Sequence, residues 1–401
     1  MTRFESLQPV ERNFVRWRGR KFDFFSGCDY FRLASHPAVL RAAAAGLKRF
    51  GLNVAASRLT TGHHRIYEML ERQLADFFQT EDALLLSSGY LTGTVVAQAL
   101  AGNFSHALVD ERAHPALLDA AVQLDCPVLK FKHRDADDFA RAVARCGPGA
   151  RPVILTDGMF SHDGSVAPLK AYLKILPYDG LILVDDAHGA GVLGNTGKGT
   201  PEYEGVGNFL NGGRAAAAAR GGAAAPPPPR RGPQIIQCVT LSKAFGVYGG
   251  AVLGPYELRE KILKRSRAFI GSTPLPPPLA NAALQSVKLL GRHGKKLRRC
   301  LNQNAALVKT ALRAAGWEIP ETPGPIAPLH TRTGTEARAL KKHLLAAGIY
   351  PPFVKYPGGD ANGYFRFVIS SGHSRAQLDR LIAAVAEFKR MRLTGTSGFR
   401  R

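Results

Sequence analysis

The stretch Leu181-Ile182-Leu183-Val184-Asp185-Asp186-Ala187-His188-Gly189 decides the fold of this chain. Its four leading apolar residues are typical of a strand that is buried on both faces, and such strands occur in parallel sheets. Two carboxylates and a histidine follow at the carboxyl end of the strand, where open α/β sheets bind their ligands. The stretch therefore predicts a parallel sheet with a polar site at the end of one strand.

A second motif follows later in the chain, in Thr240-Leu241-Ser242-Lys243-Ala244-Phe245-Gly246, with Gly249-Gly250 just beyond. A lysine among hydroxyl groups and glycines, together with a carboxylate at a strand end, is the donor set that pyridoxal phosphate requires. Lys243 would form the Schiff base, and Asp185 would pair with the protonated pyridine nitrogen. An isolated lysine is more often simply exposed, but the ordered pair of motifs favours the cofactor.

Further residues complete the predicted cofactor site. His188 would hydrogen-bond the phenolic oxygen of the cofactor, and Asp186 would have a structural part. The turn Ser88-Gly89-Tyr90 would offer backbone amides to the phosphate at a helix N-terminus, and Thr240 would donate to the same phosphate. His114 would stack on the pyridine face.

Strand-like and helix-like segments alternate over residues 65–255, which is typical of a mostly parallel sheet covered by helices. We expect a helix over 66–78 and another from Thr94 to Leu100. The seven expected strands are 83–86, 107–110, 128–131, 153–156, 181–184, 235–240 and 251–253. The predicted fold class is α/β, with a mostly parallel seven-stranded sheet covered by helices in the large domain.

The pattern changes from about Ser286, where long basic helices, a helix over 335–348 and an alternating strand over 364–370 predict a smaller α+β domain. The expected division is an N-terminal segment 1–45, a large cofactor-binding domain 46–285 and a small C-terminal α+β domain 286–401. Residues 211–233 are rich in Ala, Gly and Pro and are expected to form a surface loop of low complexity.

Composition limits the function classes. The net charge is +23, with 54 Lys and Arg against 31 Asp and Glu, and the basic residues are spread along the 401-residue chain, so we expect no nucleic-acid partner. No apolar run is long enough to cross a membrane, and no secretory signal is apparent. The five cysteines have neither metal-binding spacing nor an even count, which favours a reduced cytoplasm, and no metal site is expected.

Several blocks of the chain match blocks that are typical of one enzyme family. They are Phe25-Ser26-Gly27-Cys28-Asp29-Tyr30, Ser87-Ser88-Gly89-Tyr90, Asp110 to His114, Asp157-Gly158-Met159-Phe160-Ser161-His162-Asp163-Gly164, Asp185 to Gly194, the Lys243 block and Gly271-Ser272-Thr273-Pro274. On these blocks the chain resembles the α-oxoamine synthases, which have the fold type I of pyridoxal-phosphate-dependent transferases. The resemblance runs from about Gly19 to the C-terminal helix, apart from the low-complexity segment.

The resemblance also implies roles for residues that no local pattern singles out. Ser272 and Thr273 would reach the phosphate from a partner subunit, which implies a homodimer with its active sites at the subunit interface. Arg366 would hold the amino-acid carboxylate through its bidentate guanidinium. Ser161 would lie beside the phenolic oxygen, and Cys28 would lie near the substrates.

The implied reaction is a decarboxylating condensation of an amino acid with an acyl-CoA or acyl carrier protein. Lys243, His114, Asp185 and His188 are the expected catalytic residues. The products are an α-amino ketone, CO2 and free thiol. General similarity favours the family member that makes 8-amino-7-oxononanoate from L-alanine and a pimeloyl thioester in biotin biosynthesis.

The chain departs from the usual family blocks at four positions. It has Cys28 where asparagine is usual, Arg32 for glycine, Tyr67 for histidine and Asp157 for glutamate. Other substrate pairs of the same family, including those of secondary metabolism, therefore stay open. So do a different pyridoxal-phosphate reaction and a catalytically silent relative that acts as a binding partner.

Overall fold

The computed structural model describes residues 6–11, 13–211, 233–355 and 362–393. The chain forms two compact units. We call residues 36–160 and 166–295 the large unit, and residues 1–35, 161–165 and 296–401 the small unit. The domain bounds expected from the sequence stay a prediction, and the low-complexity segment lies almost wholly outside the described residues.

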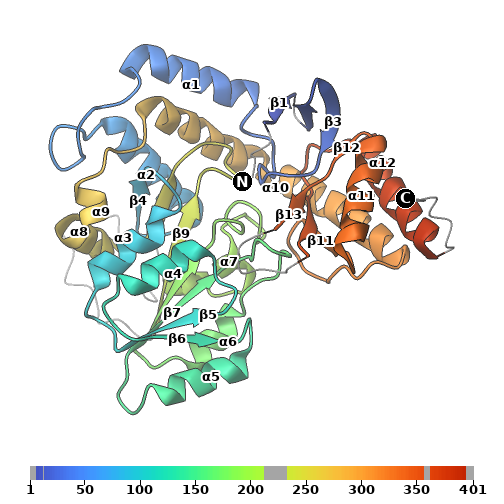
Figure 1. Cartoon of the computed structure of the whole chain (residues 1–401). Coiled ribbons are helices and arrows are strands. Elements are labelled where there is room, and N and C mark those ends of the chain that lie inside the picture. Colours follow the sequence, from blue (N-terminus) through green and yellow to red (C-terminus); the bar gives the residue numbers. More distant parts are fainter. Residues whose placement is uncertain (1–5, 12, 212–232, 356–361, 394–401) are drawn as a thin grey trace. The chain divides into compact units, whose positions relative to one another are not determined.

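A seven-stranded sheet forms the centre of the large unit (Figure 1). The strand order is β4-β10-β9-β8-β7-β5-β6. Strand β10 runs antiparallel to both of its neighbours, and the remaining neighbours pair in parallel. The strands are β4 (Asp82–Leu86), β5 (His106–Asp110), β6 (Val128–Phe131), β7 (Pro152–Asp157), β8 (Leu181–Asp185), β9 (Gln234–Thr240) and β10 (Gly250–Gly254). The predicted mostly parallel seven-stranded sheet is confirmed.

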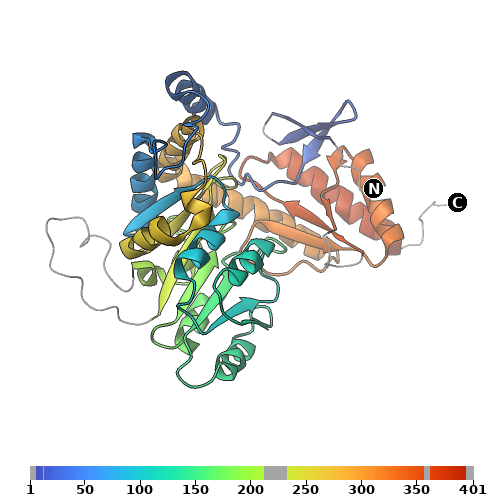
Figure 2. The same ribbon diagram turned by 60° about the vertical axis from the view of Figure 1, so that its left-hand side comes forward.

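Helices lie on both faces of this sheet (Figure 2). Leu181 and Leu183 of β8 belong to one buried core, whereas Ile182 and Val184 belong to another, because successive side chains of a strand point to opposite faces. The helices are α1 (Pro37–Phe50), α2 (Arg65–Phe78), α3 (Leu91–Leu100), α4 (Pro115–Val122), α5 (Ala136–Arg145), α6 (Leu169–Ile175), α7 (Thr200–Tyr203), the 3-10 helix η1 (Gly207–Asn211), α8 (Tyr256–Arg265) and α9 (Arg267–Ile270).

In its described residues, the small unit contains two sheets and three helices. In the first sheet, β3 pairs with the short strand β12 in parallel, although the two are far apart in sequence. The second sheet has the order β11-β14-β13, and α11 and α12 lie side by side (Figure 1). The strands are β1 (Gln8–Val10), β2 (Phe14–Trp17), β3 (Arg20–Phe24), β11 (Ile326–His330), β12 (Ile349–Tyr350), β13 (Phe353–Val354) and β14 (Tyr364–Val368). The helices are the C-terminal part of α10 (Pro277–Ala314), which starts in the large unit, α11 (Gly334–Ala346) and α12 (Arg375–Leu393).

Both chain ends contribute to the core of the small unit. Phe25 is fully buried among residues of α10, α11, β14 and α12. Within the described ranges, no helix combines the length and the apolar character that a membrane crossing requires. All five cysteines are free thiols.

Candidate active site

The carboxyl end of the large-unit sheet carries the predicted cofactor residues. Asp185 is the last residue of β8, and the buried His188 follows in the turn after it. Lys243 lies in a tight loop between β9 and β10, where Leu241 N–H donates to Gly249 O at 2.9 Å. Gly249 has φ of +123°, a backbone conformation that side chains rarely permit. The sequence thus places the lysine and the carboxylate at the same edge of the sheet.

His114 and Asp157 join this group. The backbone N–H of His114 donates to Asp157 Oδ2 at 2.7 Å, and Asp157 is the register partner of Asp185 on the neighbouring strand. Burial lowers the pKa of His114, the charge of Asp185 opposes this, and the charge of Lys243 lowers it further. Burial, followed by repulsion from Asp185, raises the pKa of Asp157 well above its ordinary value. His114, Asp157, Asp185 and Lys243 therefore lie close enough together for their charges to interact.

The tautomer of His114 follows from its position at the start of α4. Its Nδ1 accepts a hydrogen bond from Ala116 N–H at 3.2 Å, which makes the ring the N-cap of the helix. A nitrogen that accepts carries no proton, so the proton of the neutral ring is on Nε2. His114 thus presents an N–H donor on the side away from the helix.

Asp186, the next residue after Asp185, has a different environment. Its carboxyl is fully buried and accepts from Thr200 N–H at 2.9 Å, from Gln237 Nε2 at 2.6 Å and from the Thr200 hydroxyl at 2.6 Å. Burial raises the pKa of Asp186 to about 7. A Cβ at Gly158, Gly189 or Gly199 would collide with this carboxyl. Asp186 therefore links the loops around the strand ends.

The turn Ser88-Gly89-Tyr90 lies between β4 and α3, as predicted, at the N-terminus of a helix. A Cβ at Gly89 would lie 2.6 Å from Cβ and Oγ1 of Thr240, and a Cβ at Gly250 would lie 2.6 Å from Gly89 Cα. The Thr240 hydroxyl donates to Gly249 O at 3.1 Å. The three segments thus approach each other closely, and Thr240 has to turn its hydroxyl to donate to a phosphate.

Ser272 and Thr273 lie in the segment between α9 and α10. The Ser272 hydroxyl donates to Phe269 O at 3.3 Å, and Thr273 is exposed. Their predicted role toward a partner subunit stays a prediction.

The small unit brings together Arg366 and Cys28, which were expected near the substrates, and Ser161, which was expected beside the phenolic oxygen of the cofactor. Arg366, on β14, donates from Nη1 to the backbone oxygen of Ser161 at 3.1 Å and from Nη2 to Cys28 Sγ at 3.6 Å. Two of these residues come from opposite ends of the chain, and the third comes from the short segment 161–165. The guanidinium is therefore held in place by groups that the sequence alone does not connect.

A buried lysine supports the segment 161–165 within the small unit. Lys309 Nζ donates to Thr322 O at 2.8 Å, Thr322 Oγ1 at 2.9 Å and Gly324 O at 2.6 Å. Thr322 Oγ1 in turn donates to Asp163 O at 2.7 Å. Burial lowers the pKa of Lys309 to about 8. Sequence reasoning missed this lysine, because helical spacing on a basic helix gave no sign that it is buried.

The two remaining departures from the family blocks, Arg32 and Tyr67, also have a structural context. Arg32 adopts a left-handed backbone with φ of +56°, the conformation in which glycine is favoured. Its guanidinium donates to Ser370 Oγ at 3.2 Å and to Phe24 O at 3.4 Å. Tyr67 is fully buried, and burial raises the pKa of its phenol to about 12. The chain thus keeps a glycine-like turn at residue 32 and adds hydrogen bonds to it.

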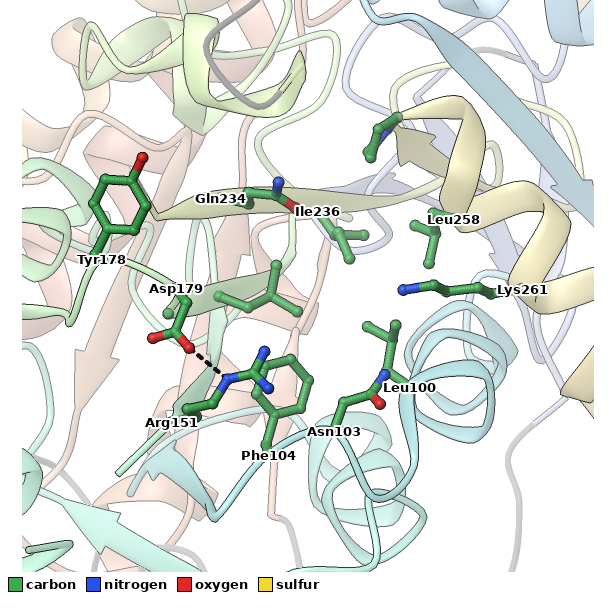
Figure 3. A pocket seen from close by; sticks show the side chains of 13 residues that line it. Leu100, Asn103, Phe104, Arg151, Tyr178, Asp179, Gln234, Ile236, Leu258 and Lys261 are labelled. Carbon is green, nitrogen blue, oxygen red and sulfur yellow. Dashed lines mark ion pairs between the residues drawn. The ribbon is translucent and has the colours of Figure 1, made fainter. Parts of the chain in front are cut away.

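A separate cavity lies at the opposite edge of the large-unit sheet (Figure 3). It has a volume of about 290 Å3 and is lined by residues at the starts of β8 and β9, such as Leu181 and Gln234. Its rim carries the Arg151–Asp179 ion pair, at 2.5 Å. Since the predicted cofactor residues lie at the carboxyl ends of these strands, this cavity is not part of the candidate active site.

The family model of aminotransferase class I and II matches residues 27–385 of the chain. A curated relative, the 8-amino-7-oxononanoate synthase of Thioalkalivibrio sulfidiphilus, is 34% identical over 373 residues, which cover 92% of this chain and 88% of the relative. The chain therefore belongs to the aminotransferase class I and II family, and within it to the α-oxoamine synthases that the sequence blocks predicted.

Solved structures agree on the fold. Serine palmitoyltransferase of Sphingomonas wittichii is 25% identical with a TM-score of 0.84, over 96% of this chain and 91% of that one. A structure of SPT with its PLP internal aldimine is 23% identical with a TM-score of 0.85, over 98% of this chain and 93% of that one. The predicted fold type I is confirmed.

Proposed function

We propose that this protein is a pyridoxal-phosphate-dependent acyltransferase that condenses L-alanine with a pimeloyl thioester, carried on CoA or on acyl carrier protein. The products are 8-amino-7-oxononanoate, CO2 and free thiol, as in biotin biosynthesis. The observation that carries the proposal is that Asp185 at the end of β8, the loop with Lys243 after β9, and His114, whose N–H donates to the neighbouring Asp157, all lie at one edge of the sheet. The similarity over 92% of the chain to an 8-amino-7-oxononanoate synthase supports the choice of substrates.

The residues present fit pyridoxal phosphate in their chemistry. Lys243 supplies the amine that binds it covalently, and Asp185 supplies a carboxylate for the pyridine nitrogen. His188 would donate to the phenolic oxygen, with Ser161 beside that oxygen, and the ring of His114 would stack on the pyridine.

The phosphate has a matching place at the turn before α3. Gly89 and Gly250 leave room where a Cβ would collide, and Ser88 and Tyr90 flank the helix N-terminus, which favours an anion. Thr240 borders the same turn. Ser272 and Thr273 of a second copy would complete the phosphate site, so the working form is a homodimer.

When bound, the cofactor supplies a conjugated ring that accepts the electron pair left on the amino-acid α-carbon. The protein moves the protons. Lys243 Nζ removes the proton from the α-carbon, and the Nε2–H of His114 is a donor for the thioester oxygen. Arg366 binds the amino-acid carboxylate with its two parallel N–H donors, beside Cys28. A new bond joins the α-carbon to the acyl carbon, and the carbon–sulfur bond breaks to release thiolate, which takes a proton from solvent. The carboxylate then leaves as CO2, and Lys243 would return its proton to the α-carbon in its place.

We place the protein in the cytoplasm, where its five free cysteines would stay reduced. Purified protein loaded with pyridoxal phosphate should show a visible absorbance band that shifts with alanine more than with glycine, serine or threonine. Alanine and pimeloyl-CoA should then give stoichiometric CO2 and free thiol. Lys243→Ala should abolish turnover and leave the fold and the dimer intact.

Other outcomes separate the alternatives. A band shift with glycine, serine or threonine would select another α-oxoamine synthase reaction. Amino-acid turnover without CO2 and thiol would indicate a different pyridoxal-phosphate reaction. Failure to bind the cofactor would overturn the proposal in favour of a silent relative.

A further inference from the structure

A hydrogen bond connects the predicted phosphate turn to helix α4. Tyr90, directly before α3, donates its hydroxyl to Asp119 Oδ2 of α4 at 2.6 Å. This distance is in the short range of hydrogen bonds to a charged acceptor. The same bond raises the pKa of the Tyr90 phenol, so the hydroxyl keeps the proton that it donates. The phenol is 45% exposed, and the hydrogen bond fixes a ring that packing alone does not.

The fixed phenol ring lies against His114. The two rings meet edge to face, with centroids 6.0 Å apart and planes at 76°. On its other sides His114 is tied by Asp157, which accepts from its backbone N–H, and by Ala116 N–H, which donates to Nδ1. The backbone and one ring nitrogen of His114 are thus held by hydrogen bonds, and the Tyr90 ring lies against its imidazole.

Charged groups from several elements act on the His114 ring. Asp119 from α4 and Asp185 from the end of β8 raise its pKa, whereas burial and Lys243 from the loop after β9 lower it. Asp157, at the end of β7, contacts the backbone of His114. Asp119 therefore has two separable relations to His114, one through its charge and one through the phenol of Tyr90.

We propose that Asp119 and Tyr90 form a positioning pair, the His114 brace, which sets the plane of the His114 ring over the cofactor and the approaching thioester. Neither side chain has to touch the reacting atoms: Asp119 holds Tyr90, and Tyr90 holds His114. The inference rests on the proposed function for its effect on turnover, and on the geometry of the chain for its effect on the ring. Small displacements of a catalytic group cost up to about a hundredfold in rate, so even a weak brace is measurable.

Three variants separate the effect of the Asp119–Tyr90 hydrogen bond on His114 from the effect of the Asp119 charge. Tyr90→Phe removes the hydrogen bond and keeps the carboxylate, Asp119→Ala removes both, and Asp119→Asn removes the charge but keeps an oxygen that accepts from the phenol. Asp125→Asn is the matched control, because it removes an exposed carboxylate just beyond α4. Asparagine tolerates the left-handed backbone of Asp125, with φ of +57°.

The first readout is turnover. Tyr90→Phe and Asp119→Ala should each lower kcat about tenfold (~1.4 kcal/mol) with little change in KM for the amino acid. The double variant should be no worse than either single one. Asp119→Asn should keep most of the kcat that Asp119→Ala loses, and Asp125→Asn should have the kcat of the wild type. Wild-type kcat in Tyr90→Phe, or additive losses in the double variant, would overturn the brace.

The second readout does not need turnover. Histidine-labelled protein without cofactor gives an NMR titration of His114, assigned by the signal that is lost in His114→Asn. The pKa of His114 should fall in Asp119→Asn and stay unchanged in Asp125→Asn. Circular dichroism of added pyridoxal phosphate should change in Tyr90→Phe and not in Asp119→Asn. If the wild type shows these signals but no condensation with any thioester, the proposed function fails and the brace stands. If the signals do not respond to the variants, the brace fails.

Discussion

Asp157 and Asp185 are register partners at the carboxyl ends of β7 and β8, and the charge of Asp185 acts on the carboxyl of Asp157. Burial and the nearby Asp185 together raise the pKa of Asp157. A like charge nearby disfavours the ionised form of a buried carboxyl. Asp157 therefore favours its protonated form and holds His114 by its backbone, whereas the proposed function gives Asp185 the pairing with the pyridine nitrogen.

This division predicts that replacement of aspartate by asparagine has a small effect at residue 157 and a large effect at residue 185. Asp157→Asn should keep kcat/KM within about fivefold (~1 kcal/mol), because an amide resembles a protonated carboxyl and its oxygen accepts from His114 N–H. Asp185→Asn should lower kcat/KM by more than about a hundredfold (~3 kcal/mol), with a smaller effect on cofactor binding. Rates of α-proton exchange in the two variants test the point, and equal losses would contradict it.

Asp186 should make stability depend on pH. Burial raises its pKa to about 7, so the folded protein holds the proton that the unfolded chain releases near pH 4. Its contribution to the free energy of unfolding is therefore greatest below pH 4. It falls by about 1.4 kcal/mol per pH unit between pH 4 and pH 7, and it is constant above pH 7. Urea unfolding of the wild type and of Asp186→Asn from pH 4 to 8 measures this, since the difference in slope isolates the residue. Parallel curves would refute the prediction.

Lys309 should matter more for stability than its surface-exposed neighbours on α10. Lys309→Met leaves three oxygen acceptors without their donor and should cost about 2–3 kcal/mol of unfolding free energy. Lys296→Met removes an exposed lysine from the same helix and should change stability by less than about 0.5 kcal/mol. Thermal unfolding of both variants is the measurement. A similar midpoint for the two would show that the buried ammonium is dispensable.

Arg366 and Cys28 should differ in their effect on amino-acid binding. Arg366→Lys loses the planar pair of donors and should raise KM for the amino acid by about thirtyfold or more (~2 kcal/mol), with KM for the thioester little changed. Cys28→Ala removes only a weak sulfur acceptor at 3.6 Å and should change the same KM by less than about threefold. Steady-state kinetics with each substrate varied in turn decides between them.

Gly89→Ala should weaken cofactor binding, because the added Cβ would lie 2.6 Å from Thr240 and push the phosphate turn away from β9. We expect a loss of at least about tenfold in affinity for pyridoxal phosphate, which is ~1.4 kcal/mol. Gly254→Ala is the control in the neighbouring strand β10, since its Cβ would have 3.5 Å to the nearest atom. Fluorescence titration of both apoproteins gives the two affinities, and equal values would argue against the close approach at Gly89.

Much of the large unit could be predicted from sequence because its strands are short, mostly apolar and bounded by turn residues. Leu181 to Val184 is the clearest case, since a strand buried on both faces has no polar position to blur the pattern. The ends of such strands then indicate the site. The pattern does not predict β1, β2 and β3, because these strands are short and mix polar residues with apolar ones, which leaves only a weak alternation.

The finer parts of the site depend on contacts between distant residues. The coupling of Asp157 to Asp185 requires the strand register, and the link from Tyr90 to Asp119 requires the packing of α3 on α4. The burial of Lys309 has no local signal at all. Residue types reveal which chemistry is available, whereas pKa shifts and orientations come from neighbours that only the fold supplies.

The small unit combines residues from early in the chain with residues from late in it. Phe25 is buried among residues 305–388, and β3 pairs with Ile349 and Tyr350. During synthesis the ribosome releases the whole large unit before these partners exist, and domains generally fold as they emerge. Strands β1, β2 and β3 can pair with one another early, but β3 must wait for β12 and Phe25 for its core neighbours before the small unit can be completed. Completion of the small unit is therefore a late event in the synthesis of these residues, and a chain cut before β12 would leave β3 without its parallel partner and Phe25 without much of its core.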